Sequence, residues 1–427
     1  MKKFIILFFI FISMTFSDEI FSLNDALKIA IENNIKLKIY KDKIEQASIS
    51  RDFAFSYFFP RLSASFTYRY LGDNQPISLG PFPPMKFTDD NLYNLTFSVS
   101  QPLFTGGKIT KGYEISKVSY EKAVVDYETE LQNLILDVKK AYFEVLKAEK
   151  MVDVSRKYRE LTEKHLKDVK EMFEEGIATK LDILKVELAL KQAEVRITDS
   201  ENYLQLSKTR LNFLLNRPPE YNFEPEDILE FKRERSDYEI WKEIALKERK
   251  EIKGMEKVLS IYGKKVELER ANLFPQISLF FNYNMEKGTQ TSMDGWEDNW
   301  NTGVFLSYDI WNWGETRNKV KKAEKEKAEM EKQFELLKNG IELEVKSAYL
   351  NLLSAEQKVS QCKKQIELAE ENLRVAELLH QEGMATTTDV LDASTSLTEA
   401  RNSFYNALYE YNVAYAELEK AVGKWRN

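Results

Sequence analysis

Two short motifs carry acidic residues at a spacing that suggests a function. Thr179 is followed three residues later by Asp182, and Thr386 is followed in the same way by Asp389. The plainest interpretation is a helix start, because the threonine caps a backbone amide and the aspartate favours the positive end of the helix. The sequence therefore predicts a helix beginning just after each threonine.

The second motif carries an additional carboxylate. Asp392 follows Asp389 by three residues, which places both side chains on one face of a helix. The first motif has Lys185 at the corresponding position, so the acidic pair is found in the second motif only.

The composition excludes several other kinds of chemistry. The 427 residues include one cysteine, Cys362, and two histidines, His165 and His380. These numbers exclude an intrachain disulfide, a paired-cysteine metal site and a histidine-rich metal site within one chain. The Gly106–Lys108 segment departs from a phosphate-binding loop, because Pro102 stands where that motif needs glycine. We expect no enzymatic activity, no metal and no cofactor, and the net charge of −7 argues against a nucleic-acid partner.

The chain is expected to be built largely from long helices. It contains only 15 glycines and 10 prolines, and between about residues 109 and 175 only Gly112 interrupts the helical pattern. Apolar residues in that stretch recur at steps of three and four, which is coiled-coil spacing, and a second apolar stripe indicates a second neighbour. With 31% charged residues, a multi-span helical membrane protein is excluded.

The first 17 residues have the pattern of a secretory signal peptide. Lys2 and Lys3 precede an apolar run from Phe4 to Ile12, and small residues lead up to Ser17. The apolar run is too short for a spanning helix, so we predict cleavage after Ser17 and export of the mature chain.

The sequence is a tandem duplication. Ala141–Glu149 resembles Ala348–Glu356, and Glu175–Leu184 resembles Glu382–Leu391 at the same spacing of 207 residues. Further upstream the spacing becomes 215, which indicates an insertion within 71–91 and therefore a surface loop. The predicted organisation is a signal peptide at 1–17, a first repeat at 18–216, a linker at 217–236 and a second repeat at 237–427.

Each repeat is expected to run helix, strand, loop, strand, long helix, turn, helix. Capping boxes at Ser22–Asp25 and Ser236–Glu239 predict the first helix, which ends at Pro60 or Pro275. After each proline the apolar residues alternate with polar ones, which predicts strands at about 61–70, 92–100, 276–284 and 300–308.

These strands have the features of a membrane barrel. Each is about ten residues long, and aromatic residues gather at the strand ends, as they do at lipid interfaces. Two soluble hairpins with one face on a core are the other interpretation. Four strands cannot close a barrel and open edges are not tolerated in lipid, so several chains must contribute. Three copies would supply twelve strands.

These features together resemble the TolC family of outer-membrane efflux proteins. The most specific evidence for this resemblance is the motif Glu-Gly-x-Ala-Thr-x-x-Asp-[Ile/Val]-Leu, which occurs twice. The Phe-Pro pairs at the strand starts and the Leu103-Phe-Thr-Gly-Gly segment also support it. The resemblance implies a mainly α fold with membrane β structure: a homotrimer whose twelve-stranded outer-membrane barrel continues as a long α-helical periplasmic barrel. It also implies an exit duct for efflux or type I secretion, docked to a periplasmic adaptor and an inner-membrane transporter. The cargo is not identified.

The resemblance assigns roles to particular residues. Asp389 and Asp392 correspond to aspartates that ring the periplasmic constriction, where six carboxylates of a trimer would favour cations. Asp182 corresponds to a gate residue that bonds a tyrosine and an arginine, but those positions here are His380 and Ala385. Either His380 pairs with Asp182 and makes closure pH-dependent, or it is an ordinary surface histidine.

The two turns resemble the tips on which the adaptor docks. They comprise Gly176, Ile177, Ala178 and Thr179 in the first repeat and Gly383, Met384, Ala385 and Thr386 in the second. Simple turn formation is the other interpretation of these residues. For the whole protein, the alternative function is a secreted coiled-coil structural or adhesin-like protein.

Overall fold

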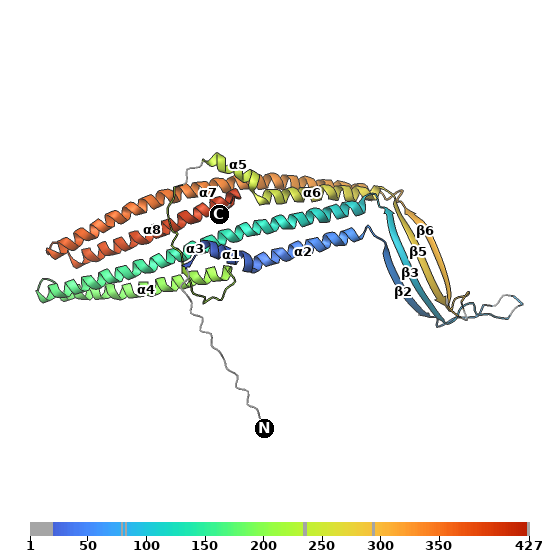
Figure 1. Ribbon diagram of the computed structural model, residues 1–427, viewed down its shortest axis with the longest axis horizontal. Coiled ribbons are helices and arrows are strands. Elements are labelled where there is room, and N and C mark those ends of the chain that lie inside the picture. The colour runs from blue at the N-terminus through green and yellow to red at the C-terminus, as the bar shows by residue number, and fades with distance from the viewer. Residues whose placement is uncertain (1–19, 78–79, 82, 234–236, 293–294, 425–427) are drawn as a thin grey trace, which may run out of the picture. The chain divides into compact units, whose positions relative to one another are not determined.

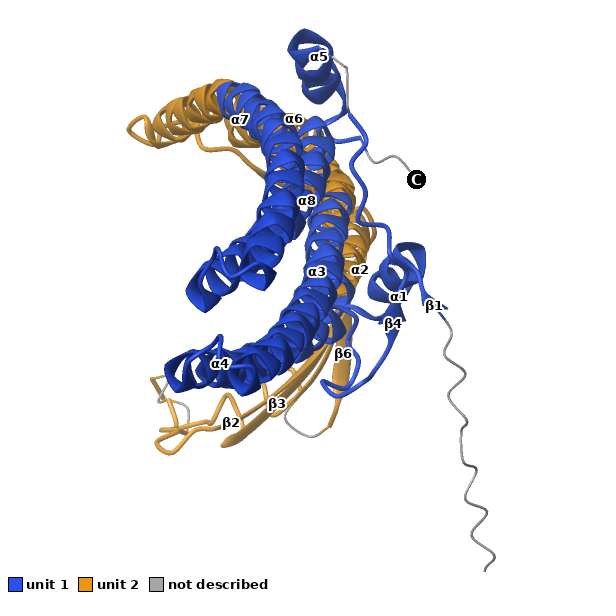
Figure 2. Cartoon of the chain, turned by 90° about the vertical axis from the view of Figure 1, so that its left-hand side faces the viewer, with its two compact units in different colours: residues 1–39, 128–250, 338–427 blue, residues 40–127, 251–337 orange. Residues whose placement is uncertain are grey.

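The computed structural model describes residues 20–77, 80–81, 83–233, 237–292 and 295–424. The predicted signal peptide, residues 1–17, lies outside the described residues. The chain divides into two compact units, one comprising 1–39, 128–250 and 338–427 and the other 40–127 and 251–337. Each unit draws residues from both halves of the chain (Figure 2).

The elements occur in the same order twice, in agreement with a duplicated unit (Figure 1). The first set is α1 (Leu23–Asn33), α2 (Ile35–Ser56), β2 (Arg61–Tyr70), β3 (Asn91–Phe104), α3 (Lys108–Glu174) and α4 (Lys180–Leu214). The second set is α5 (Tyr238–Glu248), α6 (Lys250–Arg270), β5 (Gln276–Lys287), β6 (Glu297–Ser307), α7 (Glu315–Gln381) and α8 (Thr387–Val422). Short pieces complete the described fold: β1 (Ile20–Phe21), β4 (Glu224–Pro225) and a 3₁₀ turn at Ala271–Leu273.

The helix expected before each proline is in fact two helices. The backbone leaves the helical conformation at Asn34, between α1 and α2, and at Arg249, between α5 and α6. The first start is confirmed, because Ser22 and Asp25 form a full capping box. The second start is shifted, since Asp237 caps α5 in place of Ser236, which lies outside the described residues.

The four long strands form one antiparallel sheet in the order β2-β3-β5-β6. All four predicted strands are confirmed, although β3, β5 and β6 extend beyond their predicted bounds. Directly paired residues share a face of the sheet, so the register shows which side chains gather. One face carries Leu62, Phe66, Tyr68, Leu95, Phe97, Val99, Phe281, Tyr283, Trp300 and Val304. The opposite face carries Ser63, Ser65, Thr67, Asn94, Thr96, Ser98, Asn282, Asn284, Asn299 and Asn301.

A steric requirement explains the first glycine of the Gly106–Lys108 segment. Gly106 lies in the turn between β3 and α3 with a φ of +63°. A Cβ atom at this position would lie 2.4 Å from the carbonyl oxygen of Ala271. The glycine is therefore needed for a close backbone approach in a left-handed turn.

The long helices α3 and α7 each contain 67 residues, or on the order of 100 Å of helix. The predicted apolar stripe of α3 is buried at Leu134, Val138, Ala141, Val145, Ala148 and Val152. Tyr142 of the second stripe is also fully buried, and its hydroxyl donates to the carbonyl oxygens of Phe21 and Glu226 at 2.8 and 3.1 Å. Among the described helices, none combines the length and the apolar character that crossing a membrane requires.

Candidate functional site

Each long helix turns back through a tip built around a glycine. Gly176 and Gly383 have φ angles of +75° and +71°, a left-handed conformation that glycine adopts without strain. The amides of Ile177 and Met384 donate back to the carbonyls of Met172 and Leu379, both at 2.8 Å. The result is two helical hairpins, α3–α4 and α7–α8 (Figure 1).

The two threonine–aspartate motifs both form capping boxes directly after the tips. The carboxylate of Asp182 accepts hydrogen bonds from the amide and hydroxyl of Thr179, at 3.0 and 2.6 Å. The carboxylate of Asp389 accepts the same pair from Thr386, both at 2.7 Å. In each copy the hydroxyl hydrogen bond is the main cause that lowers the pKa of the aspartate. The carboxylates are therefore ionised at neutral pH.

Asp392 lies on the exposed side of α8, three residues after Asp389. Both carboxylates are exposed to solvent in the single chain. At the corresponding place on α4, Lys185 donates to the hydroxyl of Thr388 at 3.1 Å and so links the two hairpins. The first repeat thus uses this position for a contact between hairpins, while the second presents two carboxylates to solvent.

His380 does not lie on the surface, so its interpretation as an ordinary surface histidine is wrong. Only 6% of its area is exposed, because it lies in the last turn of α7 against the start of α8. Its Nε2 lies 3.3 Å from the hydroxyl of Thr387, and its ring lies 5.1 Å from that of His165 on α3. The described contacts of His380 are thus with Thr387 and His165, and Asp182 is engaged by its own cap.

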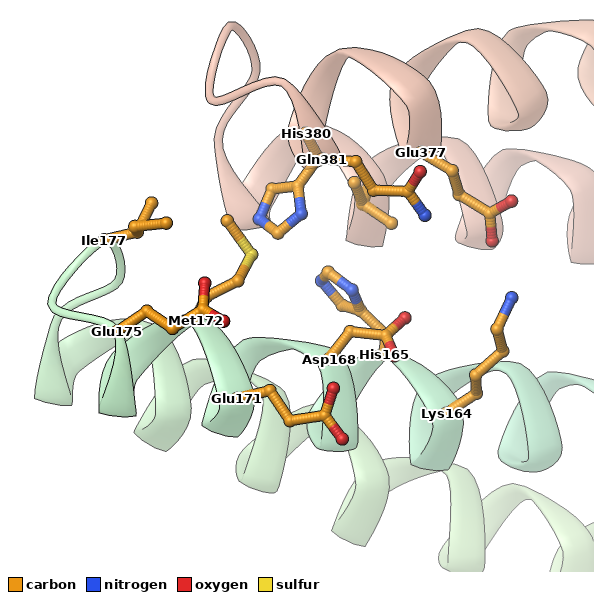
Figure 3. A pocket seen from close by; sticks show the side chains of 11 residues that line it. Lys164, His165, Asp168, Glu171, Met172, Glu175, Ile177, Glu377, His380 and Gln381 are labelled. Atoms are coloured by element: carbon orange, nitrogen blue, oxygen red, sulfur yellow. The ribbon is translucent and has the colours of Figure 1, made fainter.

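The two histidines lie in a pocket between the hairpins (Figure 3). The pocket has a volume of about 250 Å³ and is lined mainly by side chains of α3 and α7. Carboxylates of Asp168, Glu171 and Glu377 surround it, with Lys164 at one side. In the described part of the chain, no group of three or more His, Cys, Asp or Glu side chains could hold a metal ion.

The sequence did not identify His165 as part of this site. It lies on α3, and it contacts His380 only because the two hairpins pack together. The one available signal was composition, since these are the two histidines of the whole chain.

Apolar clusters hold each hairpin together near its tip. Leu166, Val169, Ile183 and Val186 pack within the first hairpin, and Leu391 of the second packs against them. Ala369, Leu373, Val390, Ala393, Leu397 and Ala400 pack within the second, and Leu161 of the first packs against them. Each cluster thus also includes one leucine of the other hairpin.

The tip residues are open to solvent. Ile177 and Met384 are 60% and 70% exposed, and the backbone amide of each donates to a carbonyl of the preceding helix. Exposed apolar side chains on a rigid turn are suited to a contact with another protein.

Comparisons with known proteins agree with this architecture. A sequence model of the family described as outer membrane efflux protein matches residues 26–217 and 241–424. The alkaline protease secretion protein AprF of Pseudomonas aeruginosa is 22% identical over 412 residues, which cover 93% of this chain and 84% of AprF. The outer membrane protein TolC of Vibrio cholerae is 25% identical over 315 residues, 70% of this chain and 69% of TolC.

Solved structures show the same fold. The CmeC outer membrane channel of Campylobacter jejuni superposes with a TM-score of 0.80 at 18% identity, covering 94% of this chain and 85% of CmeC. The outer membrane protein VceC of Vibrio cholerae superposes with a TM-score of 0.78 at 17% identity, covering 94% of this chain and 96% of VceC. The predicted fold class is confirmed.

Proposed function

This chain belongs to the outer membrane efflux protein family, and from this premise we propose that three copies form the exit duct of a tripartite efflux or type I secretion system. The protein resides in the cell outer membrane, with most of its helical portion in the periplasm. The alternative of a secreted coiled-coil structural or adhesin-like protein is wrong, because the family match covers both repeats.

The sheet is the observation that carries the proposal. One face is mainly apolar and the other mainly polar, with Phe280 and Phe305 as exceptions on the polar face, which suits a wall between lipid and a water-filled lumen. In the described structure β2 pairs only with β3, and β6 pairs only with β5. Because lipid does not tolerate unpaired strand edges, β2 of one copy must pair with β6 of another. Three copies give a barrel of twelve strands, which is within the range of outer-membrane barrels.

The acidic pair of α8 is the proposed constriction of this duct. Asp389 and Asp392 are exposed in one chain, and in a trimer they would supply six carboxylates around one axis. Asp389 is ionised at neutral pH, because its pKa is lowered by hydrogen bonds from Thr386. Closely spaced negative charges in a narrow passage raise the local concentration of cations. The closed duct is therefore expected to select cations.

The tips are the proposed contact with the rest of the transport system. Ile177 and Met384 are the exposed apolar side chains of the two turns, and helix ends of this kind suit a groove on a helical partner. The partners are a periplasmic adaptor and, through it, an inner-membrane transporter, which supplies the cargo.

Single-channel recording in planar lipid bilayers tests this function. The purified trimer should conduct and should prefer K⁺ over Cl⁻ when the reversal potential is measured across a KCl gradient. The double variant Asp389→Asn/Asp392→Asn should reduce that preference several-fold, since six charges leave the constriction.

A carboxylate elsewhere on the second hairpin provides the matched control. Glu367→Gln removes one charge from an exposed pair with Lys364 on α7 and should leave the preference unchanged. Unchanged selectivity in the double variant would reject the constriction, whereas a protein that forms no channel would reject the duct itself.

A further inference from the structure

The two histidines of the chain lie against one another across the gap between its hairpins (Figure 3). The ring centroids of His165 on α3 and His380 on α7 are 5.1 Å apart, and the ring planes are inclined by 67°. Both side chains are more than nine-tenths buried, with 8% and 6% of their area exposed. Two buried imidazole rings are thus held close together between α3 and α7.

Neither ring forms an ion pair with a carboxylate in the described structure. Nε2 of His165 is buried without a hydrogen-bond partner among the described residues, and Nε2 of His380 lies 3.3 Å from the hydroxyl of Thr387. Burial without a charged partner disfavours an imidazolium, because a buried charge must be paired to be tolerated. The observed packing therefore suits a neutral ring at His165.

Charged groups surround the two rings on all four packed helices. They are Lys164, Asp168 and Glu171 on α3, Glu175 directly after α3, Glu377 on α7, Asp182 on α4 and Asp389 on α8. Asp182 and Asp389 are held by their own caps, and the others lie along the pocket wall. The carboxylates of the pocket wall, and not the capped Asp182 and Asp389, would receive a charged His165 side chain once the rings separate.

We propose that His165 and His380 form a proton-operated latch between the two hairpins, closed while the buried ring of His165 is neutral and released when acid charges that ring. The inference rests on the proposed duct, because release of the hairpins at their tips would widen the periplasmic end. At the tips, the described contacts between the hairpins include the histidine pair, the hydrogen bonds of His165 with the backbone of Thr387 and of Lys185 with Thr388, and one leucine at each apolar cluster.

The direction of the pH effect follows from His165. Burial, followed by the neighbouring His380, lowers the pKa of His165 from 6.5 to about 4. A lowered pKa means that the closed state binds fewer protons than the separated state, so the latch is fully effective above pH 6.5 and weakens as pH falls toward 4. The closed-to-open ratio should fall by as much as about tenfold per pH unit in that interval.

The first measurement is the open probability of single channels between pH 7.5 and pH 4.5. The wild type should open more often as pH falls, and His165→Phe/His380→Phe should lose that rise, because phenylalanine keeps an aromatic contact that cannot be charged. If the double variant does not assemble, the more conservative single variant His165→Gln can be measured instead. It should reduce the rise in open probability. An unchanged pH profile in these variants would overturn the latch.

The constriction carboxylates provide the control for this experiment. Asp389→Asn/Asp392→Asn removes two carboxylates near the tip of the second hairpin, and it should change ion selectivity and leave the pH dependence of opening intact. If this variant lost the pH dependence of opening while the histidine variants kept it, the pH dependence would be assigned to the carboxylates and the latch would be rejected.

A chemical probe tests the latch without any channel current. In a Cys362→Ala background, Val390→Cys places a thiol at a pocket position that is 3% exposed, whereas Met384→Cys places one on the open tip. The ratio of their modification rates by a methanethiosulfonate reagent corrects for the pH dependence of the reagent. This ratio should rise in acid only when both histidines are present. A ratio that rises in acid, in a protein that forms no channel, would reject the proposed duct and support the latch. A ratio that does not change with pH would reject the latch.

Discussion

At the tips, one carboxylate serves both the fold and the proposed passage. Asp389 accepts two hydrogen bonds from Thr386 and thereby fixes the first turn of α8, which also holds Asp392 in place. The cap keeps the carboxylate ionised, so the bonds that start the helix also maintain the charge. The corresponding Asp182 has the cap without the neighbouring acid.

The cap can be separated from the charge by changing the threonine alone. Thr386→Ala should destabilise the first turn of α8 by about 1 kcal/mol, because the backbone amide of Asp389 loses its side-chain acceptor. Hydrogen exchange of the amides from Thr387 to Val390 should accelerate accordingly. Thr388→Ala, which loses only the exposed contact with Lys185, is the control and should leave these amides protected.

The sequence predicted these caps but missed the histidine pair, for a physical reason. A capping box is a local pattern of four residues, so the letters of Thr179–Asp182 are sufficient to identify it. The contact of His165 with His380 depends on how two hairpins from different repeats pack together. No local periodicity carries that information, and for the same reason the sequence could not tell a buried His380 from an exposed one.

Among the elements, the breaks at Asn34 and Arg249 serve the same purpose in the two repeats. The side chain of Asn34 donates to the carbonyl of Leu214 at the end of α4, at 2.9 Å. The guanidinium of Arg249 donates to the carbonyl of Ala421 near the end of α8, also at 2.9 Å. Each side chain satisfies a carbonyl that the end of a helix leaves unpaired. These two breaks could not be predicted from the sequence, because neither position carries glycine or proline.

Arg249 also has an ionic partner, which makes it the more costly residue to remove. The side chain is only 3% exposed and donates to the carboxylate of Glu344 at 2.8 Å. Arg249→Ala should lower the free energy of unfolding by about 2–3 kcal/mol, since hydrogen bonds to charged groups are lost and a carbonyl is left unpaired. Thermal unfolding of the purified protein measures the change.

A surface arginine provides the comparison for this prediction. Arg374 is bonded to Glu371 one turn away, and its side chain is 60% exposed. Arg374→Ala should change stability by less than about 0.5 kcal/mol, as is usual for exposed pairs. Equal effects for Arg249→Ala and Arg374→Ala would contradict the role of the helix break.

For the whole molecule, the two faces of the sheet determine how copies can assemble. The alternation of apolar and polar residues in the sequence was sufficient to place all four strands and to assign most residues to a face. Successive side chains of a strand point to opposite faces of the sheet, so alternating residues lie on the same face. The ends of the strands were less predictable. β3 continues to Phe104 and β6 starts at Glu297, in segments without clear alternation.

Neighbouring positions on β2 test which face contacts lipid. Phe66 pairs with Leu95 on the apolar face, and Thr67 pairs with Asn94 on the polar face. Phe66→Lys should destabilise the inserted barrel by about 2–4 kcal/mol, whereas Thr67→Lys should be tolerated in a water-filled lumen. The yield of folded trimer in the outer-membrane fraction compares them, and a greater loss from Thr67→Lys would reverse the assignment of faces.

The two unpaired edges of this sheet have a genetic consequence. Because every copy contributes one arc of a shared wall, a chain with a damaged strand spoils the two sound chains that assemble with it. In a cell that makes sound and damaged chains equally and mixes them at random, only about one eighth of homotrimers would be entirely sound. Alleles that alter β2 or β6 but still allow assembly should therefore be dominant, whereas alleles that prevent assembly altogether should be recessive.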